Sequence, residues 1–223
     1  MILPPENEEI LLKRVNHLAG LSLGQLDAMC VEHRVRRFHK GWVGQLLEHA
    51  LGATAGSLPE PDFKNLSIEL KTLPLGKHGH PIESTFVASI DLRNIIHETW
   101  ETSWVARKLK RVLWIPVEGD RTIPLLERRL GMGFLWSPSL PEENVLRQDW
   151  CELTEYIALG NFSEITARYG QYLQIRPKAA DGRSLCWGWD DAGEKIQTLP
   201  RGFYLRACFT KRLLQRGNEQ SNL

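Results

Sequence analysis

Two acids and a lysine stand beside an apolar run in the segment PEPDFKNLSIELKTL. Because side chains alternate along a strand, Glu69 and Lys71 should leave one face while Ile68 and Leu70 enter the other. Asp62 precedes this strand, so a turn would have to return it to Glu69. Taken singly, such charges most often form an ion pair on an exposed strand face. The order of the three residues makes a shared site worth considering.

Carboxylates beside an ammonium group suit the hydrolysis of a phosphodiester. That reaction needs a nucleophilic water, neutralisation of charge at phosphorus and help for the leaving oxygen, and divalent metals supply all three. Mg²⁺ prefers hard oxygen ligands and is usually held by one or two carboxylates together with the substrate phosphate. The pattern therefore predicts that Asp62 and Glu69 bind a metal and that Lys71 orients water or stabilises phosphate.

Hydrophobic periodicity predicts the elements that position these residues. Helices are expected at 6–19, 22–31, 42–52, 123–131 and 142–159, and a last one in TKRLLQR. Strands are expected at 66–75 and 84–92, joined as a hairpin across the turn at 76–81, at 111–117 and 134–138, and in QYLQIRP, KIQTLP and GFYLRACF. This order favours a mixed α/β fold.

Composition and charge narrow the class of protein. The 223 residues are 42% apolar and 25% charged, as in an ordinary globular protein. The net charge is only +1, yet basic residues cluster at 33–40, 106–111 and 201–216, which predicts one positive face. No apolar run reaches the roughly 20 residues of a membrane span, and the acidic start is unlike a signal peptide, so we expect a cytoplasmic protein without membrane contact.

Longer blocks of sequence point to a known family. The order P-D, (D/E)-x-K is the signature of restriction-endonuclease-like nucleases, and the chain is similar over nearly its whole length to the MutH family of DNA mismatch-repair endonucleases. The resemblance rests on KGWVGQLLE, LGATAGSLPEPDF, IELKTLP, ESTF, KLKRVLWIPVEG, YLQIRPKAA and LPRGFYL.

The resemblance implies a fold and a domain plan. It implies a restriction-endonuclease-like mixed sheet flanked by helices, with two lobes that form a DNA-binding cleft. Residues 1–223 would be one such domain, with a catalytic lobe at about 1–105, a DNA-reading lobe at about 106–215 and a disordered tail at 216–223.

The resemblance also assigns catalytic roles. Asp62 and Glu69 would be metal ligands, with the Leu70 backbone carbonyl and the Glu48 carboxylate completing the site. Lys71 and Lys108 would be catalytic lysines. For Glu48, the alternative is a position on the rim of an apolar helix, but its location beside the signature favours the metal role.

Further residues are expected to contact DNA. By resemblance these are Lys40, Phe86, Lys110, Arg176, Pro177, Lys178 and Tyr204. Arg176 suits bidentate recognition of guanine, and Tyr204 would lie near the adenine methyl group. Strand pattern alone favours core packing for Phe86 and Tyr204. The segment WGWDDAG, residues 187–193, has no role that we can assign.

The implied activity is nicking of the unmethylated strand at hemimethylated GATC sites, 5′ to the G, with Mg²⁺ as cofactor. We expect Mn²⁺ to substitute and Ca²⁺ to bind without supporting cleavage. The implied partners are double-stranded DNA, MutL as activator and MutS indirectly, and the implied state is a monomer. Two alternatives are a dimeric type II restriction enzyme that cuts both strands and a DNA-binding module without catalysis.

Overall fold

The chain forms two compact units, each built from segments that are distant in sequence. The computed structural model describes residues 2–30, 41–56, 58, 60–161, 169–178 and 184–221. The first unit comprises residues 1–83, 110–137 and 211–223, and the second comprises 84–109 and 138–210. The sequence predicted one boundary near residue 105, whereas the chain passes between the two units several times.

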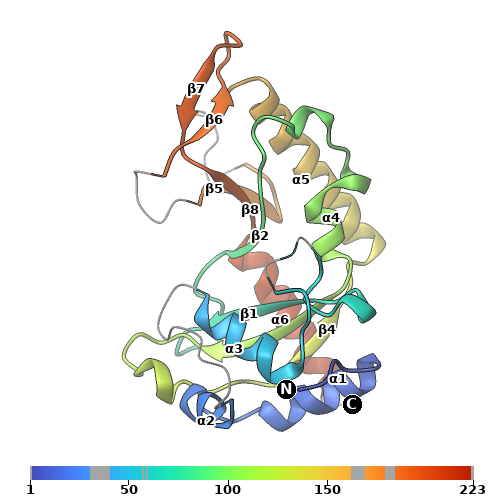
Figure 1. Cartoon of the computed structure of the whole chain (residues 1–223), viewed down its shortest axis with the longest axis vertical. Helices are drawn as coiled ribbons and strands as arrows, with labels where there is room; N and C mark the ends of the chain where they lie inside the picture. The colour runs from blue at the N-terminus through green and yellow to red at the C-terminus, as the bar shows by residue number, and fades with distance from the viewer. Residues whose placement is uncertain are drawn as a thin grey trace. The chain divides into compact units, whose positions relative to one another are not determined.

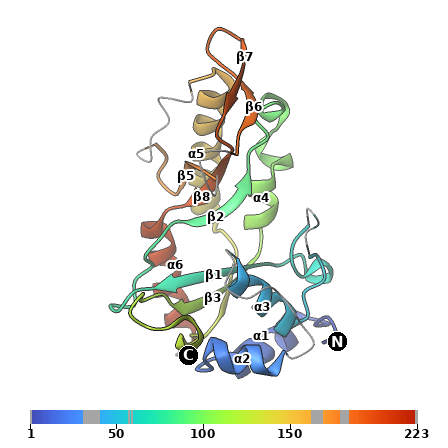
Figure 2. The same cartoon turned by 60° about the vertical axis from the view of Figure 1, so that its left-hand side comes forward.

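The described residues contain both helices and strands (Figures 1 and 2). The α-helices are α1 (Glu8–Leu18), α2 (Leu23–Met29), α3 (Trp42–Leu51), α4 (Trp104–Leu109), α5 (Leu140–Ala158) and α6 (Ala207–Ser221). The strands are β1 (Glu69–Leu75), β2 (Thr85–Ser89), β3 (Val112–Glu118), β4 (Phe134–Trp136), β5 (Leu173–Pro177), β6 (Cys186–Trp189), β7 (Lys195–Thr198) and β8 (Arg201–Leu205). Short 3₁₀ helices are η1 (Lys64–Leu66), η2 (Ile95–His97), η3 (Trp100–Thr102) and η4 (Leu125–Glu127). This confirms the mixed α/β class.

The first unit contains a mixed sheet in the order β1-β3-β4. β1 runs parallel to β3, with Glu69 opposite Val112, and β3 runs antiparallel to β4. All residues of β3 except its last are buried, which explains why its sequence is continuously apolar rather than alternating.

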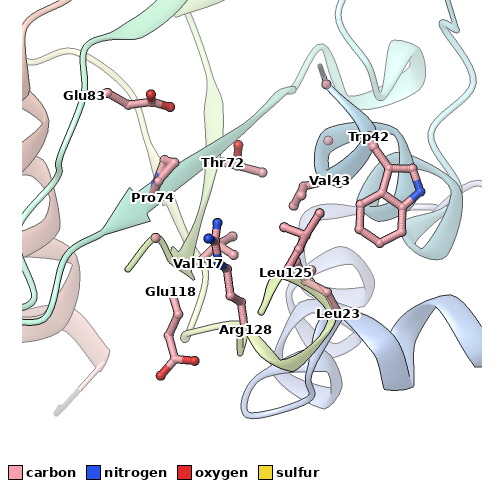
Figure 3. Close-up of a pocket in the computed structure, with 13 residues that line it drawn as sticks. Leu23, Trp42, Val43, Thr72, Pro74, Glu83, Val117, Glu118, Leu125 and Arg128 are labelled. Atoms are coloured by element: carbon pink, nitrogen blue, oxygen red, sulfur yellow. The ribbon is translucent and has the colours of Figure 1, made fainter. Parts of the chain in front are cut away.

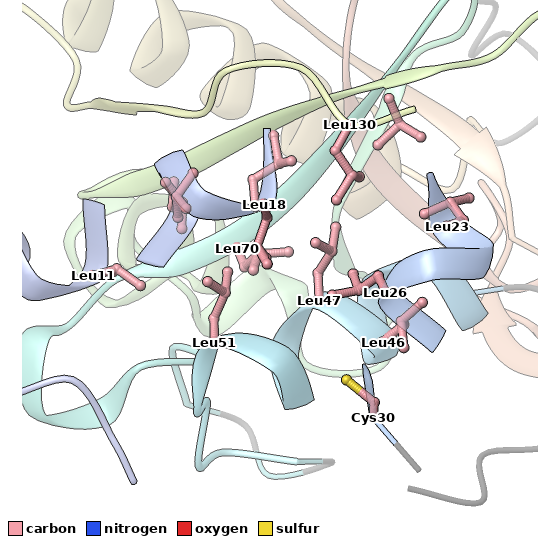
Figure 4. Packing of buried hydrophobic residues seen from close by; sticks show 14 of the residues in the cluster. Leu11, Leu18, Leu23, Leu26, Cys30, Leu46, Leu47, Leu51, Leu70 and Leu130 are labelled. Carbon is pink, nitrogen blue, oxygen red and sulfur yellow. The ribbon is translucent and has the colours of Figure 1, made fainter. Parts of the chain in front are cut away.

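One face of this sheet carries the core of the first unit. Leu70 of β1 and Leu113 of β3 pack with leucines of α1, α2 and α3, among them Leu47 (Figure 4). Side chains at even positions of β1 therefore point into the core, so Glu69 and Lys71 project from the opposite face. The helical stripe of α3 is what fixes this orientation of the strand.

The ends of α3 follow from its sequence. Gly52 ends the helix at φ +83°, and its backbone N–H donates to the carbonyl of Glu48. A Cβ at Gly52 would lie 2.5 Å from the Leu3 carbonyl oxygen, so glycine is required both for conformation and for space.

The second unit holds an antiparallel sheet in the order β2-β8-β5. Its buried face is formed by alternate residues such as Val87, Ile175 and Phe203, and α4 and α5 pack against its outer strands. In β8 the other face carries Gly202 and Tyr204. Period-two alternation thus separates a packed face from an open one.

Three expectations from the sequence are corrected. The strands at 66–75 and 84–92 do not pair with each other as a hairpin. Instead β1 pairs with β3, and β2 pairs antiparallel with β8. The helix expected at 123–131 is only the single turn η4. Residues 216–221, expected to be disordered, are the last turns of α6, and residues 222–223 lie outside the described residues.

The segment left without a role forms the hairpin β6–β7. Trp187 and Trp189 lie on one face of β6, each with 46% of its surface exposed, while Gly188 between them is buried. The Lys195 ammonium lies 4.5 Å from the Trp187 ring centroid. The hairpin therefore presents an aromatic outer face.

None of the helices in the described ranges is both long enough and apolar enough to cross a bilayer.

A buried carboxylate on α5 holds the start of β5. Asp149 accepts hydrogen bonds from the backbone N–H groups of Gln171, Tyr172 and Leu173, at 2.7, 2.5 and 2.8 Å. Gly170 precedes them at φ +81°, where a Cβ would collide with the Leu173 carbonyl. The carboxylate thus gives three successive backbone donors a partner, and the last of them, the Leu173 amide, belongs to a buried residue.

We predict that Asp149→Ala lowers the free energy of unfolding by about 3 kcal/mol, because buried amides lose their acceptor. Glu152→Ala, an exposed carboxylate on the same helix, is the control and should change it by less than about 0.5 kcal/mol. Urea denaturation measures both. Equal effects of the two variants would show that Asp149 does not anchor β5.

Candidate active site and DNA-reading face

Asp62 is joined directly to β1. Its Oδ2 accepts a hydrogen bond of 2.7 Å from the backbone N–H of Leu70. The chain returns through η1 and through Ser67, which adopts φ +54°, and Phe63 and Ile68 form a β-bridge that closes the turn. The geometry that the sequence left open is therefore present: Asp62 lies beside the strand that carries Glu69 and Lys71.

The Leu70 carbonyl points to the same side as Asp62. The Glu69 N–H donates to the Arg111 carbonyl, so the backbone N–H and C=O of Glu69 point toward β3 in the parallel ladder. Backbone groups alternate along a strand, and the N–H and C=O of one residue share a side. The Leu70 carbonyl therefore leaves the outer edge of β1, where a metal ligand was expected.

Glu69 and Lys71 form a buried ion pair. The Lys71 Nζ lies 3.0 Å from Glu69 Oε1, and the two side chains are only 7% and 4% exposed. Removing two charges from water is costly and is repaid only in part by their attraction. The two residues therefore do form an ion pair, but the pair is buried and does not lie on an exposed strand face. Such a costly arrangement is typical of a functional site.

Glu48 lies on α3, which packs against β1. The side chain is half-buried, and its Oε1 would lie 3.8 Å from a Cβ at Gly44, one turn earlier in the helix. This is an ordinary contact distance, so the Glu48 carboxylate lies alongside the preceding turn of α3.

The donor atoms at this edge fit a hard divalent cation. Two carboxylates and a backbone carbonyl are available from Asp62, Glu69 and Leu70, and Mg²⁺ keeps several water ligands besides. Within the described part of the chain, no three Asp, Glu, His or Cys side chains are gathered closely enough to enclose a metal by themselves. In this conformation Glu69 is turned to Lys71 and Asp62 to the Leu70 amide, which accounts for the open arrangement.

The basic residues at the end of α4 and just after it differ in their surroundings. Lys108 is half-buried in α4, in the second unit, and Lys110 is exposed. Arg111 donates from Nε and Nη2 to the two carboxylate oxygens of Glu8, at 2.9 and 2.5 Å. Arg111 thereby ties α1 to the start of β3. Lys40 lies outside the described residues.

Phe86 and Tyr204 face away from the core of the second unit. Their rings meet edge to face with centroids 5.4 Å apart, on the open face of the β2-β8-β5 sheet. Both are half-buried, while Val87 and Phe203 beside them in sequence are fully buried on the other face. Core packing, the interpretation favoured by strand pattern alone, is therefore wrong for these two aromatic residues.

Two cations lie over these rings. The guanidinium carbon of Arg176 is 5.9 Å from the Tyr204 centroid, and the Lys178 ammonium is 4.5 Å from the Phe86 centroid. Pro177, between them, is exposed and lies opposite Arg201 at the end of β5. The structure thus gathers Phe86, Arg176, Lys178 and Tyr204 into one cluster, which we call the cation–aromatic face.

The Tyr204 hydroxyl remains protonated in this cluster. Burial raises its pKa above the ordinary value, and the nearby positive charge of Arg176 opposes that shift. A neutral phenol can both donate and accept a hydrogen bond.

Three further residues that support this face were not predicted from the sequence. Ser84 and Ser89 accept hydrogen bonds from Arg176 and Lys178, and Gly202 lies beneath the Phe86 ring. A glycine inside a strand signals close approach of another group, so RGFYL did contain a sign of Gly202. The serines carry no such sign, because their role depends on pairing between distant strands.

A separate pocket of about 260 Å³ lies in the first unit, further along β1 (Figure 3). It is lined by Thr72 and Pro74 of β1, the first turn of α3 and the segment around Arg128. Asp62, Glu69 and Lys71 do not line this pocket, so it is distinct from the candidate metal site at the edge of β1.

We predict that Gly202→Ala displaces the Phe86 ring, because the new Cβ would lie 2.9 Å from Phe86 Cε2 and 3.0 Å from the Ala88 carbonyl oxygen. The free energy of unfolding should fall by about 1–3 kcal/mol. Gly44→Ala is the comparison, since its Cβ meets nothing closer than 3.8 Å and should stabilise α3 by about 0.5–1 kcal/mol. Denaturation curves and the nuclear Overhauser contacts between Phe86 and Tyr204 measure the two effects; an unmoved ring in Gly202→Ala would contradict the prediction.

Comparison with known proteins places this site in a family. The family model described as "DNA mismatch repair enzyme MutH" matches residues 51–149, which include Asp62, Glu69 and Lys71. The chain is 53% identical over 218 residues to the DNA mismatch repair protein MutH of Escherichia coli O6:K15:H31 (strain 536 / UPEC), covering 97% of this chain and 95% of the relative. It is 52% identical over 219 residues, with the same coverage, to the DNA mismatch repair protein MutH of Shigella flexneri serotype 5b (strain 8401). The chain therefore belongs to the MutH family of DNA mismatch repair enzymes.

Proposed function

We propose that the protein is a metal-dependent endonuclease that nicks the unmethylated strand of hemimethylated GATC sites, 5′ to the G, during mismatch repair. The observation that carries the proposal is the hydrogen bond between Asp62 and the Leu70 amide, which holds one acid beside a strand bearing Glu69, Lys71 and an outward carbonyl. Membership of the MutH family supports the substrate and the role in repair.

The metal would be held by oxygen ligands of the first unit. Asp62, Glu69 and the Leu70 carbonyl are the proposed ligands of Mg²⁺, with Glu48 as an additional carboxylate; Mn²⁺ would substitute. When bound, the cation supplies an activated nucleophile and neutralises charge at the phosphate. Ca²⁺, which favours the same ligands with looser geometry, would support DNA binding without cleavage.

Lys71 would stabilise the negative charge of the reacting phosphate. Its ammonium donates to Glu69 Oε1, so Lys71 and the acid that would hold the cation leave the same face of β1. An ammonium at the reacting phosphorus stabilises the charge that develops on the non-bridging oxygens. Lys108 is proposed as a second lysine of the active site.

The cation–aromatic face is the proposed reading surface. Arg176 can present two parallel donors to guanine N7 and O6, and Lys178 adds positive charge. Tyr204 is the proposed sensor of adenine methylation, since its ring and hydroxyl lie on the open face of the sheet. Lys40, Lys110, Phe86 and Pro177 complete the proposed DNA contacts.

One catalytic set in each chain supports cleavage of one strand per binding event. We therefore propose a monomer that acts on double-stranded DNA and is activated by MutL after MutS has detected a mismatch. A dimeric restriction enzyme would give double-strand breaks, and a non-catalytic module would bind DNA without any cleavage.

We predict that Asp62→Asn and Glu69→Gln each lower the nicking rate by about 10²-fold or more, since each loses a charged ligand. Lys71→Met should do likewise by removing the charge at the phosphate. Glu60→Gln is the matched control, because this exposed acid pairs with Lys64 near the surface and should leave the rate unchanged.

The assay is nicking of a hemimethylated GATC plasmid with Mg²⁺, together with DNA binding in Ca²⁺. The products distinguish a nick from a double-strand break. Full activity in Asp62→Asn or Glu69→Gln would reject the site, and binding without cleavage by the unaltered protein would reject the enzymatic proposal.

We predict that Tyr204→Ser narrows the difference in rate between hemimethylated and fully methylated GATC duplexes, because the group beside the methyl is removed. Tyr204→Phe, which keeps the ring and loses only the hydroxyl, separates contact by the ring from hydrogen bonding. Rates on matched oligonucleotides measure the ratio; an unchanged ratio in Tyr204→Ser would remove Tyr204 from methyl sensing.

A further inference from the structure

Two serines beside β2 hold the two cations of the cation–aromatic face. The Arg176 Nη1 donates to Ser84 Oγ at 2.7 Å, and the Lys178 Nζ donates to Ser89 Oγ at 2.5 Å. Ser84 immediately precedes β2 and Ser89 ends it. The same short strand therefore sets the position of both side chains, which come from β5 and the residue that follows it.

The contact with Ser84 orients a planar group. The Arg176 guanidinium donates to the Ser84 hydroxyl and lies over the Tyr204 ring. A hydrogen bond from Nη1 fixes one end of the planar fork, which limits how far the group can rotate. Bidentate recognition of a base requires the two donors to lie in the plane of the acceptors. An arginine side chain loses considerable rotamer freedom on binding, so a group that holds it beforehand reduces that cost.

The contact with Ser89 restrains a different kind of donor. The Lys178 ammonium has three rotatable donors and no plane, so it can meet an acceptor from many directions. It also lies close to the Phe86 ring, which keeps it near the sheet without the hydroxyl. Loss of Ser89 should therefore matter less for the choice of base than loss of Ser84.

We propose that Ser84 is a positioning residue for base selectivity, which holds the Arg176 guanidinium in the plane required to read guanine. The proposal rests on the proposed reading function of this face. Ser84 acts through Arg176 and does not itself contact the base.

The test uses the full-length protein with Mg²⁺ and hemimethylated duplexes in which the GATC guanine is either unmodified or replaced by 7-deazaguanine, which lacks the N7 acceptor. The measured quantity is the ratio of kcat/KM on the unmodified duplex to that on the 7-deazaguanine duplex. Four variants are compared: Ser84→Ala, Ser84→Thr, Ser89→Ala and Arg176→Met. Thermal unfolding shows that each is folded.

For the unaltered protein we expect a ratio of about 10 or more, from loss of one contact of a bidentate pair. Ser84→Ala should lower the ratio to within about threefold of Arg176→Met, with the loss expressed on the unmodified duplex. Ser84→Thr keeps a hydroxyl and should restore the ratio, and Ser89→Ala should keep it.

A wild-type ratio in Ser84→Ala, or an equal loss of the ratio in Ser89→Ala, would overturn the proposal. A ratio near one for the unaltered protein would overturn it as well, because Arg176 would then not read N7. In each of these cases nicking of the unmodified duplex leaves the proposed endonuclease function standing; absence of that nicking would reject the function itself.

Discussion

The hydrogen bond between the Asp62 carboxylate and the Leu70 amide is the contact on which the first unit's site depends. Asp62 lies outside the strand, and this 2.7 Å bond ties its carboxylate to the edge of β1. The bond uses an N–H that the parallel ladder with β3 does not need, because Leu70 points its backbone groups outward. The edge position of β1 is thus a functional requirement: a further strand there would consume the amide and the carbonyl.

The apolar core on the other side of β1 offsets the energetic cost of burying Glu69 and Lys71. Leu70 packs with the helices α1 to α3, so alternation forces Glu69 and Lys71 to the opposite face, where they are almost fully buried as an ion pair. A buried pair contributes little to stability and is often less favourable than apolar side chains of similar size. The buried Glu69–Lys71 pair is therefore better explained by a catalytic role than by a contribution to stability. The neighbouring strand β3 is apolar in all but its last residue and supplies the packing energy that the pair does not.

The second unit uses the same alternation for a different purpose. Its sheet buries Val87, Ile175 and Phe203 on one face and presents aromatic rings and cations on the other. Arg176 and Lys178 lie over these rings, and Asp149 anchors the beginning of the strand from which they extend. Charge is in this way concentrated locally on a protein whose net charge is only +1.

Local patterns were sufficient for most of the elements and for the chemistry. The apolar stripe of α3 with Gly52 at its end, the continuous run of β3 and the long pattern of α5 were each predicted at nearly their observed positions, because periodicity and capping act within a few residues. The hairpin of 66–75 with 84–92 was wrong because the true partner of β2, β8, lies more than a hundred residues further on.

By itself the sequence determined which residues could do chemistry: the acids, the lysines and the blocks that mark the family. Tertiary structure alone decided that Asp62 reaches the Leu70 amide, that Glu69 and Lys71 are buried together, that Arg111 binds Glu8, and that Ser84 and Ser89 hold Arg176 and Lys178. Residue type sets what a side chain can donate, accept or bind. Which partner it meets depends on strand pairing and turns between distant segments, and no local pattern encodes that pairing.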